Sequence, residues 1–395
     1  MKVEMLSTGD EVLHGEIVDT NAVWLANTFY EAGYAMTFRT TSGDCLLTLV
    51  QTLQQRSRVA DVLIVNGGLG PTSDDFTAQA AAQAAGVGLV RNAEWLRELK
   101  AFFERRGREM AAINLKQADN PDTAEMLPNG NGTACGFRLE LNDCQIFFTP
   151  GPPAEFKLMI TEQVLPRLAQ YFPLPEKLSC LRLTTFGRGE SFIAALLADI
   201  SLPAEATLGY RAAAPIVEIK LSGYQTQLAD MEACWQVIKA RVSDFTLFEG
   251  KGSFAAEIAT WLSEHHYRLQ LNEGFSAGLL NWTLANGGVA LGGTQITGTE
   301  EIIDLETWAA PLSEKPAAQT LFLAISPLAN RREIGFILAT PQQTYTLQAV
   351  ISDALLAAPH RLQEVVVLQA MYLVHRWLSG QPVTLIYQGL ELIAD

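Results

Sequence analysis

The fold is decided by one stretch, Val62-Leu63-Ile64-Val65-Asn66-Gly67-Gly68-Leu69-Gly70-Pro71-Thr72-Ser73-Asp74-Asp75. Its first four residues are apolar and mostly β-branched, which is typical of a buried strand, and a glycine-rich turn follows. Pro71, Thr72 and Ser73 are typical of a helix start, and Gly86 is typical of a helix end. The stretch therefore predicts a strand–loop–helix unit with its loop at the carboxyl end of the strand.

The loop of this unit suits an anion, most often a phosphate. Its glycines let backbone amides approach a ligand, and the start of a helix adds unpaired N–H groups. Asp74 and Asp75 would repel a phosphate unless a divalent cation lies between them, and Mg²⁺ binds such carboxylates together with phosphate oxygens. We interpret the loop as a metal-assisted phosphate or pyrophosphate site. The alternative is a pair of acids that only stabilises a helix start.

The loop matches neither of two common phosphate motifs. No Gly-Lys-Ser/Thr follows it, which excludes a P-loop. Gly68-Leu69-Gly70 begins a dinucleotide fingerprint, but Ser73 replaces the third glycine. No acid follows about 20 residues later at a strand end, as that fingerprint requires.

Composition narrows the class of protein. The chain has 395 residues, of which 48% are hydrophobic, so two or three domains are expected. A net charge of −15 argues against binding to nucleic acid or to an anionic membrane. Five widely spaced cysteines without a Cys-x-x-Cys pair indicate reduced thiols in a cytoplasmic protein. No apolar stretch is long enough to span a membrane, and we expect neither nucleic-acid nor membrane partners.

The units that come before and after this stretch repeat its pattern. Val3–Leu6 is a predicted strand that ends in a small-residue loop, and the predicted strand 35–41 ends at Gly43-Asp44. Three strand–loop–helix units in a row predict a mostly parallel sheet, whose loops share one edge. The residues expected at that edge are Thr8, Gly9, Asp10, Asp44, Gly67, Gly70, Asp74 and Asp75.

The pattern changes twice further along the chain. Residues 137–148 form a predicted hairpin, and Pro150-Gly151-Pro152-Pro153 opens a further helix. A linker at 173–177 precedes a strand–helix pattern that predicts a small α+β domain. We therefore expect three domains, at residues 1–172, 178–250 and 253–395.

Several spaced motifs together resemble the CinA family of competence/damage-inducible proteins. They are Leu6 to Asn21, Gly43-Asp44, Gly67 to Asp75, Gly132-Thr133-Ala134 and Pro150 to Glu155. The resemblance implies a three-layer α/β N-terminal domain like the molybdopterin-binding modules, an α/β C-terminal domain, and a homodimer. It also implies metal-dependent hydrolysis of a nucleotide substrate, ADP-ribose, to AMP and ribose 5-phosphate.

We assign roles for such a hydrolase as follows. A divalent metal (Mg, Mn or Co) would be held by residues among Asp10, Asp44, Asp74 and Asp75. The phosphates would be bound by Ser7, Thr8, Gly9, Gly67, Gly68, Gly70, Thr72, Thr133 and Gly151. The catalytic residues would be Asp44, Asp74 and Lys116, with the lysine neutralising developing charge.

The C-terminal third is similar in layout to the family's nicotinamide-nucleotide amidase domain. The family carries Ala-Glu-Ser-Cys-Thr-Gly-Gly there, with serine as nucleophile, whereas this chain has Asn272-Glu273-Gly274-Phe275-Ser276-Ala277-Gly278. Segments 297–301 and 326–331 also depart from the family pattern. We expect a degenerate domain whose amidase activity is lost, because glycine has no side chain to attack with. Three alternatives stay open: a pterin- or nucleotide-binding module without turnover, a structural oligomer, and a residual amidase.

Overall fold

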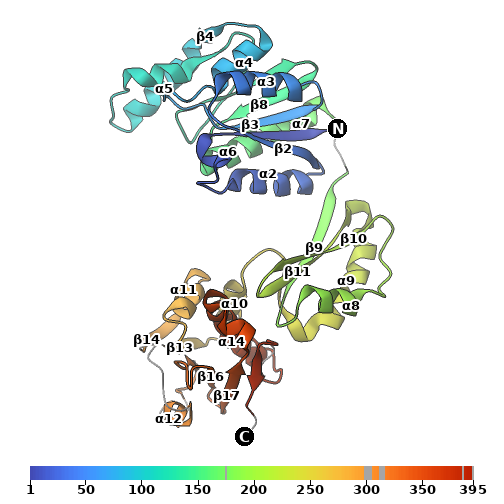
Figure 1. Ribbon diagram of the computed structural model, residues 1–395, viewed down its shortest axis with the longest axis vertical. Helices are drawn as coiled ribbons and strands as arrows, with labels where there is room; N and C mark the ends of the chain where they lie inside the picture. The colour runs from blue at the N-terminus through green and yellow to red at the C-terminus, as the bar shows by residue number, and fades with distance from the viewer. Residues whose placement is uncertain (174–175, 298–304, 311–315, 385–386, 394–395) are drawn as a thin grey trace. The chain divides into compact units, whose positions relative to one another are not determined.

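The computed structural model describes residues 1–173, 176–297, 305–310, 316–384 and 387–393. The chain divides into two compact units, Met1–Leu178 and Ser179–Asp395 (Figure 1). The three-domain division at 1–172, 178–250 and 253–395 stays a prediction. In the described part of the chain, every helix is too short or too polar to cross a membrane.

The first unit is built on a six-stranded sheet. Its strand order is β2 (Met36–Ser42), β1 (Val3–Thr8), β3 (Val62–Asn66), β8 (Cys144–Thr149), β7 (Gly136–Leu141) and β6 (Glu125–Leu127). The first four strands pair in parallel, and the last two pair antiparallel. The prediction of an α/β fold with a mostly parallel sheet is confirmed.

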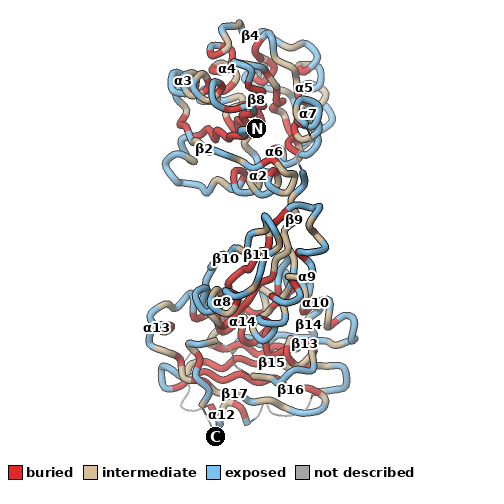
Figure 2. The backbone as a smooth tube through the Cα atoms, turned by 90° about the vertical axis from the view of Figure 1, so that its right-hand side faces the viewer, coloured by how far each residue is buried: buried red, intermediate tan, exposed pale blue. Residues whose placement is uncertain are grey.

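Helices cover both faces of this sheet and make three layers (Figure 1). One face packs against α2 (Thr20–Glu31), α6 (Pro153–Met159), a π-helix (Ile160–Val164) and α7 (Leu165–Tyr171). The other face packs against α3 (Leu46–Arg56) and α4 (Thr77–Ala85). Along β3 the side chains alternate between the two cores, which explains why this strand is apolar from Val62 to Val65. The neighbouring strand β8 is buried along its whole length (Figure 2).

Shorter elements complete the first unit. The turn after β1 contains α1 (Asp10–Leu13). The segment between α4 and β6 contains β4 (Leu89–Arg91), α5 (Ala93–Arg105), a 3₁₀ helix (Ala112–Ala118) and β5 (Asp119–Pro121).

The helix after the glycine-rich turn begins later than expected. α4 starts at Thr77 and not at Pro71–Ser73, although Gly86 ends it in the left-handed conformation as predicted. The reason is a local turn, in which the carboxylate of Asp75 accepts hydrogen bonds from the backbone N–H and the hydroxyl of Thr72. Asp74 and Asp75 therefore lie in the loop, two or more residues before the first helical N–H groups.

The second unit contains two sheets. The four-stranded sheet has the order β10 (Thr207–Ala213), β11 (Ile216–Tyr224), β9 (Leu178–Phe186) and β12 (Thr246–Glu249). It packs against α8 (Glu190–Leu197) and α9 (Leu228–Val242), and two 3₁₀ turns flank α9 (Gln225–Gln227 and Ser243–Phe245).

The six-stranded sheet has the order β14 (Leu291–Ile296), β13 (Arg268–Glu273), β15 (Thr320–Ile325), β16 (Glu333–Ala339), β17 (Thr344–Ile351) and β18 (Leu390–Leu392). Its helices are α10 (Phe254–Glu264), α11 (Leu279–Asn286), α12 (Leu305–Ala309), α13 (Asp353–Leu356) and α14 (Pro359–Leu378). Phe186 and Leu247 of the four-stranded sheet share a hydrophobic core with α14, which joins the two sheets into one unit.

Candidate functional site

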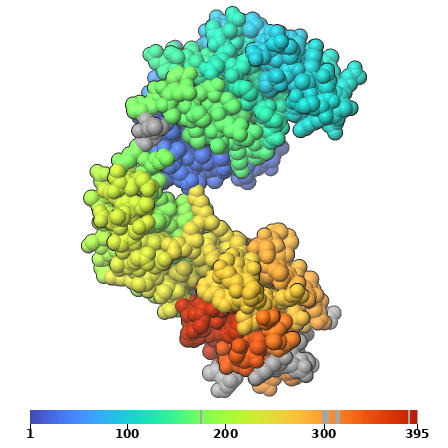
Figure 3. Space-filling model, turned by 180° about the vertical axis from the view of Figure 1, so that it is seen from behind, coloured from blue at the N-terminus to red at the C-terminus, as the bar shows by residue number. Residues whose placement is uncertain are grey.

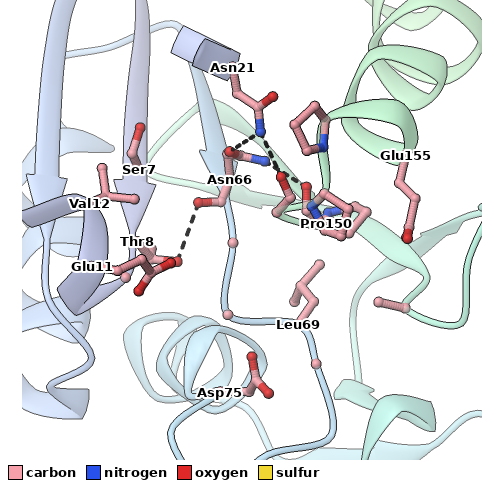
Figure 4. Close-up of a pocket in the computed structure, with 18 of the residues that line it drawn as sticks. Ser7, Thr8, Glu11, Val12, Asn21, Asn66, Leu69, Asp75, Pro150 and Glu155 are labelled. Carbon is pink, nitrogen blue, oxygen red and sulfur yellow. Dashed lines mark hydrogen bonds between the residues drawn. The ribbon is translucent and has the colours of Figure 1, made fainter. Parts of the chain in front are cut away.

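The carboxyl ends of β1, β3 and β8 meet at one edge of the first sheet. The register places Ser7 beside Asn66 and Asn66 beside Thr149. Strand order reverses between β1 and β3, because β2 lies on the outer side of β1. Open α/β sheets bind ligands in the crevice at such a point. A cavity of about 580 Å³ opens there (Figure 4).

Most of the predicted site residues line this cavity. They are Ser7, Thr8, Gly9, Asp44, Gly67, Gly68, Gly70, Asp74, Asp75, Thr133 and Gly151. The convergence of separate loops that the sequence predicts is therefore present in the fold. Asp10, Thr72 and Lys116 do not line the cavity.

Two of the predicted phosphate ligands already use their N–H groups. The N–H of Gly67 donates to the carbonyl of Thr149 (2.9 Å), and that of Gly9 donates to the carbonyl of Ser42 (3.1 Å). These bonds extend the sheet, so neither amide is available to a ligand. Gly67 has φ of 109°, and a Cβ there would lie 2.7 Å from the carbonyl oxygen of Thr8. Glycine is therefore required at position 67 for the close approach of this turn to the end of β1.

The predicted hydroxyl ligands at the cavity differ in whether they already donate their hydrogen within the protein. Ser7 donates to Asp19 (2.6 Å), and Thr8 donates to the carbonyl of Asn66 (3.3 Å). The hydroxyl of Thr133 instead accepts a hydrogen bond from the side chain of Gln117 (3.1 Å). Its own hydrogen is then available to a ligand oxygen, which makes Thr133 the best suited of the three predicted hydroxyl ligands at the cavity.

Two asparagines that the sequence reading missed hold the cavity walls together (Figure 4). The Asn66 amide nitrogen donates to the carbonyl of Pro150 (2.6 Å), and the Asn66 amide oxygen accepts from Asn21 (3.0 Å). Asn21 also donates to the carbonyl of Gly151 (2.7 Å). Both asparagines are buried. Asn66 is a polar residue at the end of an apolar strand, and this feature of the sequence could have indicated a role at the cavity.

Carboxylates dominate the charge of the cavity. Six of them line it, from Glu11, Asp19, Asp44, Asp74, Asp75 and Glu155. None of the described residues that line it is a lysine, arginine or histidine. Glu11, Asp19 and Glu155 were not among the predicted site residues. A ligand here must present N–H or O–H groups, or be accompanied by a cation.

The predicted metal ligands occupy different surroundings. Asp10 and Asp44 each accept a hydrogen bond from the other's backbone N–H (both 3.1 Å). Burial raises the pKa of the Asp44 carboxyl, and the charges of Asp10, Glu11 and Asp74 raise it further. A hydrogen bond from Thr72 lowers the pKa of Asp74. In the described residues, no group of three or more His, Cys, Asp or Glu side chains is placed to hold a metal ion.

Lys116 supports the glycine-rich turn from outside the cavity. Its ammonium group donates to the carbonyl of Thr72 and lies 5.8 Å from the centre of the Phe76 ring. It lines a separate small cavity of about 70 Å³ on the other side of Gly68–Gly70. The predicted catalytic role of Lys116 therefore has no support from its position.

The C-terminal sheet has its own strand-to-helix turn at residues 273–278. The Glu273 carboxylate is buried and accepts from the Ser276 hydroxyl (2.7 Å) and from the backbone N–H groups of residues 278, 280 and 281. A Cβ on Gly274 would lie 2.3 Å from the backbone nitrogen of Pro327. The turn thus has no room for a side chain at position 274. The hydroxyl group at this turn is that of Ser276, which is buried.

Comparison with known proteins places the whole chain in a family. A CinA-like protein of Escherichia coli (strain 55989 / EAEC) is 45% identical over 395 residues, covering 100% of this chain and 98% of the relative. The chain belongs to the CinA-like protein family. A family model described as a probable molybdopterin binding domain matches residues 4–170 of this CinA-like chain. CinA from Thermoplasma acidophilum, a solved structure of unknown function, matches with 25% identity and a TM-score of 0.39, over 43% of this chain and 96% of that one.

The comparison also corrects the expected enzyme class. The relative from Escherichia coli strain K12, 45% identical over the same span, is named "NMN amidohydrolase-like protein YfaY". That name points to a nicotinamide-nucleotide amidase. The expectation of an ADP-ribose pyrophosphatase whose amidase activity is lost is therefore wrong. The expected enzyme class came from the family resemblance of the N-terminal domain. The expected loss of activity came from Gly274 and from the segments 297–301 and 326–331, of which residues 298–301 lie outside the described residues.

Proposed function

We propose that the N-terminal unit binds a phosphate-bearing small molecule of the pterin or nucleotide class. The observation that carries the proposal is the cavity of about 580 Å³ at the β1–β3 reversal, with Thr133 facing it. Ligand pockets of this kind have volumes of about 300–1,000 Å³. The match of residues 4–170 to a probable molybdopterin binding domain supports the pterin class.

The charge of the cavity decides how such a ligand is held. Ring amino groups of a pterin, or hydroxyls of a ribose, can donate to carboxylates such as Asp19 and Glu155. A phosphate needs a divalent cation beside these acids, and Mg²⁺ commonly takes one or two protein carboxylates and completes its shell with water and phosphate oxygens. Asp44 would supply them together with Glu11 or Asp74, since all three line the cavity and the charges of Glu11 and Asp74 both act on Asp44. The cation would neutralise the phosphate charge.

Thermal unfolding of the full chain tests the binding proposal. A ligand at about 100 times its Kd stabilises the folded state by about 2.7 kcal/mol. We expect ribose 5-phosphate, GMP or a pterin phosphate to raise the Tm of the first unit, and to raise it more with Mg²⁺. Thr133→Val should weaken the shift, whereas Thr123→Val, at an exposed position outside the cavity, should leave it unchanged. No shift with any of these ligands, with or without Mg²⁺, refutes the proposal.

A second candidate function is amide hydrolysis of nicotinamide mononucleotide by the second unit. The name of the relative from strain K12 favours it. Because position 274 offers no nucleophile, such an activity would need another group, and Ser276 is the hydroxyl at that turn. Ammonia release from nicotinamide mononucleotide by the full chain tests this function. Ser276→Ala should abolish release, and release that survives this change would exclude Ser276.

A further inference from the structure

The second unit has a cavity of about 430 Å³ at the place where its two sheets meet. The four-stranded sheet contributes the start of α8 and the turn between β10 and β11, and the six-stranded sheet contributes the starts of α13 and α14 and the residues before β18. In Figure 3 the red atoms of the α14 segment lie against the yellow atoms of the segment around β12, and the Tyr372 hydroxyl donates to the Asp244 carbonyl (2.6 Å). Both walls of the cavity therefore belong to one compact unit.

This cavity has the opposite charge to the first cavity, which lies at the β1–β3 reversal. The described residues that line it include two arginines, Arg188 and Arg361, and one carboxylate, Glu190. We call it the arginine cavity. The chain as a whole has a net charge of −15, so two arginines beside one cavity are a local exception. Positive charge at a concave surface attracts small anions.

Arg361 is available to a ligand. Its side chain is exposed, and within the described residues its guanidinium group has neither an ion pair nor a hydrogen bond. A guanidinium group presents its donors as a planar fork that matches the oxygens of a phosphate or a carboxylate. Ser352 also lines the cavity, and its hydroxyl does not cap α13 or bond to any other described residue. The fork and the hydroxyl together match an oxyanion.

Arg188 is held in place by its neighbours. Its guanidinium carbon lies 5.0 Å from the centre of the Phe245 ring and 5.6 Å from that of the Phe192 ring, and the group donates to the carbonyl of Gly187 (3.0 Å). These contacts keep its positive charge at the cavity wall before a ligand arrives, so little side-chain entropy is lost on binding. Arg188 therefore supplies a fixed charge, and Arg361 supplies the direct contact.

Most of the remaining wall is apolar. It includes Ala212, Pro215, Leu355 and Tyr387, and the Tyr387 ring stacks on Phe186 at 5.3 Å between ring centres. Ligand pockets of about 300–1,000 Å³ commonly combine an apolar wall with a few polar groups that fix the orientation of the ligand. An inorganic ion would leave the apolar wall uncovered. The cavity thus suits an anion that carries an organic body.

We propose that the arginine cavity binds a small organic anion. Its phosphate or carboxylate group pairs with Arg361, and its apolar body covers the wall at Leu355 and Tyr387. None of the residues that line this cavity belongs to the first cavity or to the turn at 273–278. The inference therefore stands apart from both functions proposed above. It also differs from the first cavity in needing no metal ion, because the arginines supply the positive charge.

Calorimetric titration of the full chain in EDTA tests the inference. Phenyl phosphate and benzoate are organic anions with one ring each, and benzyl alcohol carries the same ring without a charge. EDTA prevents phosphate binding in the first cavity, because the carboxylates there need a divalent cation beside a phosphate. We expect phenyl phosphate or benzoate to bind at least about tenfold more tightly than benzyl alcohol. The tighter of the two identifies the anionic group.

Two exposed arginines of the second unit supply a matched pair of variants. Arg361 and Arg268 both lack a partner among the described residues, but only Arg361 lines the cavity. Arg361→Gln should weaken binding of the tighter anion by about tenfold or more, because hydrogen bonds to charged groups are strong. Arg268→Gln should weaken it by less than about twofold, since salt screens exposed charges outside the cavity.

Glu190→Gln supplies a variant with the opposite expected sign. It removes the one carboxylate among the described residues of the lining, so it should strengthen anion binding by about two- to fivefold. A variant that has only lost its fold cannot bind more tightly, so this gain separates a charge effect from damage to the structure. Binding of the anion that is no tighter than in the wild type overturns the inference.

Three other results also overturn the inference. They are no binding of either anion at millimolar concentration, equally tight binding of benzyl alcohol, and equal effects of the two arginine variants. Thr133→Val, in the first cavity, should leave anion binding in EDTA unchanged. Loss of binding in that variant would place the anion in the first cavity and overturn the assignment. The Mg²⁺-dependent effect of ribose 5-phosphate on the Tm of the first unit decides the proposed function separately.

Discussion

Replacing Asn66 by alanine should destabilise the first unit by about 2–4 kcal/mol. The change removes a strong bond to the Pro150 carbonyl (2.6 Å), a weak bond to the Thr149 hydroxyl (3.4 Å) and the acceptor for Asn21 (3.0 Å). Leaving one buried polar group without a partner costs about 1–3 kcal/mol. Asn21 keeps its bond to Gly151, so the largest loss falls on the Pro150 carbonyl.

Urea unfolding, followed by a probe of the first unit, measures this loss. Asn66→Asp keeps the volume but turns a carboxylate toward the Pro150 carbonyl, so it should cost at least as much as alanine. Asn27→Ala removes an exposed bond to Glu31 and should cost less than about 0.5 kcal/mol. If Asn66→Asp is as stable as the wild type, or Asn66→Ala costs no more than Asn27→Ala, the assigned role of the Asn66 amide is wrong.

Three further changes test other parts of the fold. Burial lowers the pKa of His375, so its neutral form is favoured in the fold, and the unfolded chain takes up a proton at about pH 6.5. The contribution of His375 to the stability of the second unit should therefore be full above that pH and be lost as the pH drops below it. His375→Gln should make the free energy of unfolding depend less on pH, as measured by unfolding curves between about pH 7 and 5. Gly68→Ala should lower the Tm more than Gly86→Ala: both have positive φ, but only at Gly68 would a Cβ meet another side chain, at 2.2 Å. Gly274→Ser should destabilise the second unit by about 3 kcal/mol or more in urea, whereas Gly209→Ser, with open space around it, should have a much smaller effect.

The layered architecture was predictable because it depends on local patterns. The apolar run of β3, the glycine end of α4 and the hairpin around residues 142–143 all form as the sequence indicates. Asn142 and Asp143 both adopt the left-handed conformation that such a hairpin turn requires. Local chemistry specifies these elements, so a single sequence is sufficient to find them.

The site was only partly predictable, because its chemistry depends on partners far apart in the sequence. Sequence alone showed that several loops share one edge. It did not show that the Gly67 N–H donates to the carbonyl of Thr149, which is 82 residues later. Nor did it show that Lys116 donates to the carbonyl of Thr72 from outside the cavity. The predicted start of α4 was wrong for a local reason. The Asp75 carboxylate accepts from the Thr72 N–H and closes a turn, which the residues typical of a helix start at Pro71–Ser73 did not reveal.

The side-chain amides of Asn21 and Asn66 have a consequence for how a ligand enters the first cavity. They fasten the end of β3 to the loop after β8 and to α2 before any ligand arrives. Little backbone then has to be ordered on association, so the entropic penalty of induced fit is small. Association should consequently follow simple one-step kinetics, with an observed rate that rises linearly with ligand concentration and shows no slow isomerisation phase.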